Sequence, residues 1–119
     1  MALTRRALAL DPDCIEALEH LGMIYVSRRR RFDDGLALLQ RAVELRPDDP
    51  GLWYSLGWCC EFAAQAVRRS PASDDRAADE LYRRAADAFR RCLALHPAGE
   101  LADDAADLLE LVEDQLDHG

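Results

Sequence analysis

The stretch WYSLGWCC at residues 53–60 repeats the pattern of LEHLGMIY at residues 18–25, 35 residues earlier in the chain. A second pattern starts with arginine and ends with proline: RALALDP at 6–12, RAVELRP at 41–47 and RCLALHP at 91–97. The two patterns alternate along the chain, and alternation with a period of about 34 residues is typical of helix-turn-helix repeats. The sequence therefore predicts a repeat architecture.

Local signals predict that the repeated segments are helical. Asp49 followed by Pro50 is typical of a helix start, with an N-cap residue and then a proline in the first turn. Asp13 and Glu16 fit a capping box that would open the helix containing LEHLGMIY. Apolar residues recur at helical spacing, and no segment alternates with a period of two. The chain is therefore expected to be all-α.

Both patterns resemble the tetratricopeptide repeat (TPR), which reads W-x2-L-G-x2-Y, then A-x3-F, then P. The residues that carry the resemblance are Leu18, Leu21, Gly22, Tyr25, Gly35, Leu39, Ala42 and Pro47 in the first repeat, and Trp53, Leu56, Gly57, Cys60, Ala85, Phe89, Cys92 and Pro97 in the second. The resemblance covers roughly residues 13–97. It implies a helix-turn-helix solenoid of about six helices that takes part in protein–protein interactions.

A single TPR-like domain is expected over residues 1–119. Its expected parts are a half-repeat helix (1–11), a first repeat (13–47), an elongated second repeat (49–97) and a C-terminal capping helix (99–117).

The second repeat exceeds the first by fifteen residues, and the excess lies between Cys60 and Ala85. This excess predicts that both helices of the second repeat are extended by about two turns, with a turn at residues 69–75. The residues expected to pack across this arm are Ala63, Ala64 and Val67 on one helix and Ala77, Ala78 and Leu81 on the other.

The negative charge of the chain is concentrated in its last segment. The net charge is −8, and all eight charged residues of 98–119 are acidic, so the first 97 residues are neutral overall. The apolar stripe of this segment predicts an amphipathic helix that solvates the end of the array. The acidic face could alternatively serve as a negative surface for a basic partner.

Helical phase separates a second face of residues 50–69 from the side that packs in the repeat. In TPR proteins this face of the first helix lines a concave groove that holds peptides. The residues expected to bind a partner are Tyr54, Trp58, Phe62 and Met23 as apolar anchors, with Glu16, Glu19 and Glu61 at an acidic rim. The competing interpretation is that the C-terminal helix, or another copy of the chain, covers the same row in a self-associating structural module.

The groove is not expected to clamp a C-terminal carboxylate, which is the best-known binding mode of the family. That mode needs lysine and asparagine, and the chain contains neither. In addition, Glu16 and Glu19 would repel a carboxylate. An apolar or amphipathic segment with basic flanks is the expected occupant.

Other residue clusters point to structure rather than chemistry. The run Arg28–Arg31 is expected to solvate a turn and complement a helix dipole, with contact to nucleic acid or acidic lipid as the alternative. The four cysteines are expected to be buried apolar residues, with a redox-sensitive pair of Cys60 and Cys92 as the alternative. Neither a catalytic nor a metal-ligand signature occurs, so no enzyme activity and no cofactor are expected.

Composition sets the remaining expectations. All 15 basic residues are arginine, which suggests a GC-rich bacterial genome. No signal peptide and no membrane-spanning run are recognised, so a cytoplasmic protein is expected. Its expected partners are proteins or peptides, or further copies of the chain, and not nucleic acid, membrane or a small-molecule substrate.

Overall fold

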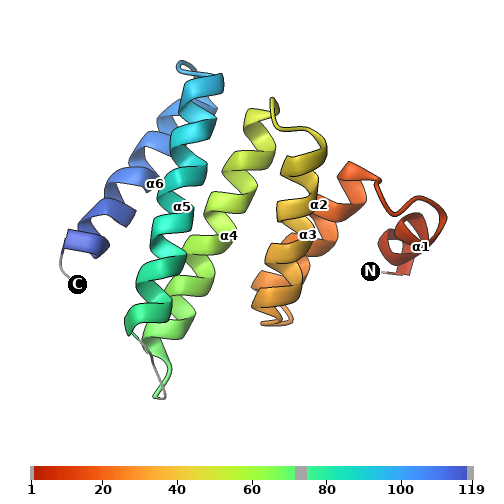
Figure 1. Ribbon diagram of the computed structural model, residues 1–119, viewed down its shortest axis with the longest axis horizontal. Coiled ribbons are helices and arrows are strands. Elements are labelled where there is room, and N and C mark those ends of the chain that lie inside the picture. Colours follow the sequence, from red (N-terminus) through yellow and green to blue (C-terminus); the bar gives the residue numbers. More distant parts are fainter. Residues whose placement is uncertain (1, 72–74, 118–119) are drawn as a thin grey trace.

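The computed structural model describes residues 2–71 and 75–117, and within these ranges it contains six α-helices and no strand, which confirms the all-α prediction. The helices follow one another in a row from the N-terminal to the C-terminal end of the chain (Figure 1). They are α1 (Ala2–Leu10), α2 (Ile15–Ser27), α3 (Phe32–Leu45), α4 (Pro50–Arg69), α5 (Asp75–Leu95) and α6 (Glu100–Asp117).

The helices form two layers of unequal spacing. In one layer α4 contacts both α2 and α6, whereas α3 and α5 in the other layer make no contact with each other in the described part of the chain. A row whose helices touch on one side and spread on the other is curved, with the α2–α4–α6 layer on the inside. We call the exposed side of this layer the concave surface.

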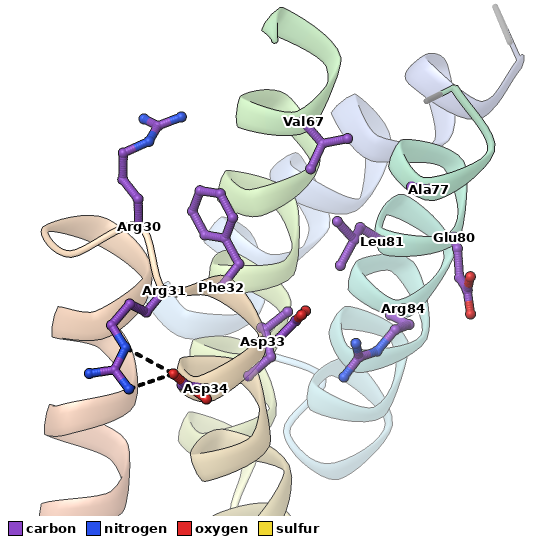
Figure 2. Close-up of a pocket in the computed structure, with 11 residues that line it drawn as sticks. Arg30, Arg31, Phe32, Asp33, Asp34, Val67, Ala77, Glu80, Leu81 and Arg84 are labelled. Atoms are coloured by element: carbon purple, nitrogen blue, oxygen red, sulfur yellow. Dashed lines mark hydrogen bonds and ion pairs between the residues drawn. The ribbon is translucent and has the colours of Figure 1, made fainter. Parts of the chain in front are cut away.

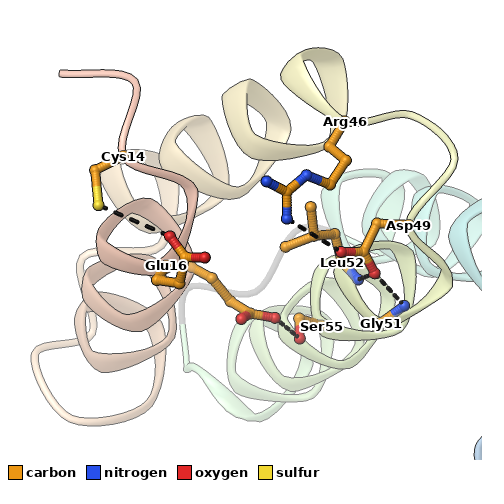
Figure 3. A network of polar contacts seen from close by, with 8 residues as sticks. Cys14, Glu16, Arg46, Asp49, Gly51, Leu52 and Ser55 are labelled. Atoms are coloured by element: carbon orange, nitrogen blue, oxygen red, sulfur yellow. Dashed lines mark hydrogen bonds and ion pairs between the residues drawn. The ribbon is translucent and has the colours of Figure 1, made fainter. Parts of the chain in front are cut away.

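The two predicted helix starts have different outcomes. The Asp49 side chain accepts hydrogen bonds from the backbone N–H groups of Gly51 at 2.9 Å and Leu52 at 3.4 Å (Figure 3), which confirms the N-cap of α4. The capping box of Asp13 and Glu16 is wrong, because Cys14 holds the N-cap position without a side-chain bond. The Asp13 carboxylate pairs with Arg41 of α3 instead, so a contact between helices replaces the local cap.

The second repeat is elongated as predicted, with 20 residues in α4 and 21 in α5. Both helices extend past the α2–α3 pair (Figure 1). Ala63 and Ala64 of α4 and Ala78 of α5 have no exposed surface, so these two helices are closely packed at these residues. Val67, Ala77 and Leu81 are only partly buried. The expected turn at residues 69–75 falls in part on residues 72–74, which lie outside the described residues.

Helix α6 packs against α5 and α4 through a narrow apolar stripe. Ala102, Ala105 and Val112 are buried. Its eight acidic residues are all exposed. The acidic face therefore solvates the C-terminal end of the row, as the amphipathic pattern predicts.

Candidate protein-binding surface

Three aromatic side chains follow one another, one turn apart, along the concave surface of α4. Tyr54, Trp58 and Phe62 are each partly exposed and pack against the core with the rest of their surface. The Tyr54 ring meets Phe89 edge-on, with 6.0 Å between ring centroids. Trp58 and Phe62 are stacked, with 5.6 Å between ring centroids. These contacts hold the exposed rings in place, and rigid aromatic surface of this kind loses little entropy on binding a partner.

Helix α2 forms one side of the concave surface. Met23 is partly buried and packs against the core. Glu19 accepts a hydrogen bond of 2.6 Å from the hydroxyl of Ser55, so its carboxylate is held against α4. Glu16 is exposed, and the Cys14 thiol lies 3.9 Å from its carboxylate. Of the two rim acids on α2, Glu16 therefore has the carboxylate that is more available to a partner.

Helix α6 forms the other side and brings in residues that the sequence did not single out. Burial, and after it the charge of Asp104, raise the pKa of the Tyr54 hydroxyl above its usual value. Leu111 is 56% exposed, in a shallow depression that it shares with Asp107, Glu110 and Asp114. In the sequence, Leu111 lies outside the expected apolar stripe of this segment and has acidic neighbours, and this pattern could have identified it as a surface residue.

Glu61 lies on α4 at the edge of a hollow of about 320 Å³ between α4 and α6. The Gln65 amide donates a 2.8 Å hydrogen bond to Glu61 Oε1. Glu61 Oε2 is shielded from solvent and has no hydrogen-bond partner, alone among the buried side-chain oxygens and nitrogens of the described residues. Burial raises the pKa of the Glu61 carboxyl above its usual value, and the bond from Gln65 opposes this shift.

Arg68 links α4 to α5 and α6 beside this hollow. Its guanidinium donates to Asp79 of α5 at 3.0 Å and to Gln115 of α6 at 2.8 Å, and it lies over the Tyr82 ring, 4.9 Å from the centroid. The concave surface is thus a row of aromatic side chains on α4 between an acidic α6 and the carboxylates of α2.

The repeat architecture agrees with a comparison of the sequence with known families. A tetratricopeptide repeat family model matches residues 2–50 and 27–90, which together make up more than half of the chain. The chain belongs to the tetratricopeptide repeat family. TPR proteins generally mediate protein–protein interactions, so this coarse role follows from the family.

One curated relative agrees with the family match. The chain is 37% identical over 54 residues to the TPR repeat-containing protein PA4667 of the bacterium Pseudomonas aeruginosa. The match covers 45% of this chain and 9% of that protein. The chain therefore spans less than a tenth of the length of this relative, and the similarity concerns the repeat.

A larger cavity of this TPR protein, of about 620 Å³, lies where the arm extends past the α2–α3 pair (Figure 2). Apolar side chains from α3, α4 and α5 line it together with three arginines and three acids. They are Phe32, Leu36, Val67, Ala77 and Leu81, with Arg30, Arg31, Arg84, Asp33, Asp34 and Glu80. The charges of this cavity balance, so they favour neither an acidic nor a basic occupant.

The arginine run at the TPR turn has structural roles. Arg31 forms an ion pair with Asp34, in which its Nε lies 2.8 Å from the carboxylate, and it also lies over the Tyr25 ring. Arg30 has a left-handed φ of 53° and lies over the Phe32 ring. Two of the four arginines thus shape the turn between α2 and α3, which favours the structural interpretation of the run.

The cysteines of the second TPR behave as buried apolar residues. Cys59, Cys60 and Cys92 have no exposed surface, whereas Cys14 is partly exposed, and all four are free. Burial raises the pKa of Cys59 to about 12 and that of Cys60 to about 11. Thiols with such pKa values stay protonated near neutral pH and are poor nucleophiles. The prediction of buried apolar cysteines is confirmed for these three residues.

Within residues 2–71 and 75–117, no three or more His, Cys, Asp and Glu side chains are grouped so that they could hold a metal ion. In the same ranges no helix combines the length and the apolar character needed to cross a bilayer.

Proposed function

We propose that the chain is a protein-interaction scaffold or adaptor that binds an apolar or amphipathic peptide or helix on its concave surface. The observation that supports the proposal is the row of Tyr54, Trp58 and Phe62, each of which keeps part of its aromatic side chain exposed. The repeat pattern does not require aromatic residues at these positions. Rigid aromatic anchors of this kind dominate the energetics of many protein interfaces.

The charges around the row favour a partner with basic flanks. The acidic residues of α6 are all exposed. After burial, the charge of Asp104 on this helix contributes to the raised pKa of the Tyr54 hydroxyl. Glu16 is exposed on α2. Opposite charges across an interface raise the rate of association and exclude wrong partners. Met23, Glu19 and Glu61 complete the proposed binding residues.

Self-association is the second candidate function. Among the described helices, α1 contacts only α2, and Leu10 near its end is 84% exposed. A second copy of the chain could cover this helix or the aromatic row, as apolar surface often marks a subunit interface.

A reducing, cytoplasmic location and a non-enzymatic role belong to the same proposal. The four free cysteines are compatible with such a compartment. A net charge of −8 argues against nucleic acid or an acidic membrane surface as partner.

Replacement of both Tyr54 and Trp58 by alanine is expected to abolish specific capture of a protein partner from an extract of the source cell. Loss of two central aromatic anchors costs about 2 kcal/mol or more each in well-packed interfaces, so the retained amount should fall at least about tenfold. Capture by the wild type and the variant is compared by affinity purification and mass spectrometry.

The matched control replaces Leu45 and Leu95, which are each 42% exposed and lie outside the concave surface, by alanine. This variant should capture the same proteins as the wild type. Equal capture by all three chains would contradict the adaptor proposal. The mass of each chain in solution is measured in parallel, and a wild-type dimer that only the Tyr54 and Trp58 changes dissociate would establish self-association instead.

A further inference from the structure

A hollow lined by two arginines lies at the end of the aromatic row, where α4 extends past the turn between α2 and α3. Phe62, the last ring of the row, lines this hollow of about 400 Å³, so the hollow continues the concave surface. We call it the arginine hollow. The residues that line it with Phe62 are Arg30, Gln65, Ala66, Arg69, Ser70 and Pro71.

The elongated arm creates this hollow. Helix α2 ends at Ser27, and the equivalent position of the second repeat, 35 residues later, is Phe62. Helix α4 continues from Phe62 to Arg69, which adds about two turns. These turns bring Arg69 to one side of the hollow, and the turn between α2 and α3 brings Arg30 to the other. A repeat of ordinary length would not place Arg69 there.

The charge of the arginine hollow favours an anion. Arg30 and Arg69 are both exposed, and no carboxylate is among the residues that line the hollow. Arg69 also borders the hollow between α4 and α6, where Arg68 and Arg69 face the single carboxylate of Glu61. Two cations that share a hollow repel each other, and an anion between them is attracted by both.

The two arginines are not neutralised by the described part of the chain. Their neighbours Arg31 and Arg68 pair with Asp34 and Asp79, whereas neither Arg30 nor Arg69 has an ion pair or a hydrogen bond with a residue of 2–71 or 75–117. Figure 2 shows that the Arg30 side chain extends away from Asp34. Its one contact of note is with the Phe32 ring, 5.5 Å from the centroid. Both guanidinium groups can therefore pair with a partner.

The acidic rim of the concave surface lies elsewhere. Glu16 is in the first turn of α2, and Arg30 follows the end of this helix, which is about 20 Å long. The acids of α6 lie on the other side of α4 from α2 (Figure 1). Salt screens exposed charges over about 8–10 Å, so the repulsion of a carboxylate by Glu16 does not extend to the arginine hollow.

A carboxylate side chain is the anion that this hollow suits best. The planar guanidinium group donates two parallel hydrogen bonds to a carboxylate, and such pairs are stronger than neutral hydrogen bonds. Phe62, Ala66 and Pro71 offer apolar surface to the stem of the same side chain. Because Phe62 lines the hollow and also ends the aromatic row, one bound segment can contact both.

We propose that the arginine hollow receives one aspartate or glutamate side chain of the bound protein segment, whose carboxylate pairs with Arg30 and Arg69. This inference rests on the proposed function, because it identifies one residue of the segment that the concave surface binds. It also gives the segment a direction. The acidic residue lies at the Phe62 end of the aromatic row, and the basic flank lies at the Tyr54 end, near Glu16 and Asp104.

The test uses peptides selected from a phage-displayed random library on the wild-type chain. The strongest peptide that needs Trp58 is synthesised with each aspartate in turn replaced by asparagine and each glutamate by glutamine. Isothermal titration calorimetry measures the affinities. One replacement is expected to weaken binding to the wild type at least about fivefold, and to change binding to the double variant Arg30→Gln, Arg69→Gln less than about twofold.

The matched control is the double variant Arg5→Gln, Arg83→Gln. Arg5 and Arg83 are exposed on α1 and α5 and do not line the arginine hollow, so the control has the same net charge as the test variant. It should prefer the acidic peptide to its neutral form as strongly as the wild type does.

Two results would overturn the inference and leave the proposed function standing. One is a set of peptides that need Trp58 but bind the wild type equally well without their carboxylates. The other is an equal loss of affinity on the wild type and on the Arg30, Arg69 variant, which would mean that Arg69 only offsets the dipole at the end of α4. A selection that yields no peptide dependent on Trp58 would overturn both the inference and the proposed function.

Discussion

Phe89→Ala is expected to lower the free energy of unfolding by about 3–5 kcal/mol, the largest effect predicted for a single substitution in this chain. Phe89 has no exposed surface. Its ring lies directly against the backbone of Gly57, where a Cβ atom would come within 2.7 Å of the ring. The same ring supports Tyr54 from below. Removal of the ring would leave a cavity between α4 and α5 beneath the binding surface.

Urea unfolding followed by circular dichroism measures this change. Leu95→Ala is the control in the same helix, because its side chain is 42% exposed and should contribute less than about 1 kcal/mol. A loss below about 1 kcal/mol for Phe89→Ala would show that the α4–α5 interface does not depend on this ring.

Gly35→Ala is expected to destabilise the fold by about 2 kcal/mol, although alanine is the better helix former by about 1 kcal/mol. A Cβ atom at Gly35 would lie 2.6 Å from the Gly22 carbonyl oxygen and 2.6 Å from Val26 Cγ2. The first contact is with backbone, which cannot move without separating α2 from α3. The close approach of the two helices thus explains why glycine replaces the alanine of the repeat pattern at this position.

Ala37→Gly calibrates the helix propensity, since Ala37 is exposed on the same helix two residues later. It should cost about 1 kcal/mol. Both variants are compared with the wild type by urea unfolding. An increase in stability for Gly35→Ala would mean that only propensity matters at Gly35 and that α2 and α3 are not in close contact there.

The fold could be predicted because its signals are local and repeated. The Leu-Gly pairs, the closing prolines and the Asp49–Pro50 helix start each follow from short-range conformational preferences, and they recur at regular intervals. The extra length of the second repeat also translates directly into longer helices, as α4 and α5 show.

Features that depend on contacts between helices could not be predicted in the same way. Asp13 has the sequence context of a capping residue, but its carboxylate pairs with Arg41, 28 residues away. Glu61 Oε2 is buried without a hydrogen-bond partner, and no sequence pattern specifies such surroundings. For the same reason, the helical projection found the aromatic row on α4 but not Leu111 on α6.

The proposed function requires that the concave side of α4 binds a protein segment while its opposite side packs in the repeat. One of the two tryptophans lies on each of these sides. Trp53 donates a 2.8 Å hydrogen bond from its indole N–H to the Pro47 carbonyl oxygen and lies under Arg91. Trp58 stacks on Phe62 at the concave surface. Trp53 can thus serve as an internal reference, and Trp58 is the proposed anchor.

The most direct measurement follows both indole N–H signals by nuclear magnetic resonance while a peptide selected on the wild-type chain is added. The signals are assigned with Trp53→Phe and Trp58→Phe. The proposed function predicts that the Trp58 signal shifts and saturates with the peptide while the Trp53 signal stays in place. Peptide binding that moves the Trp53 signal and leaves the Trp58 signal unchanged would contradict it.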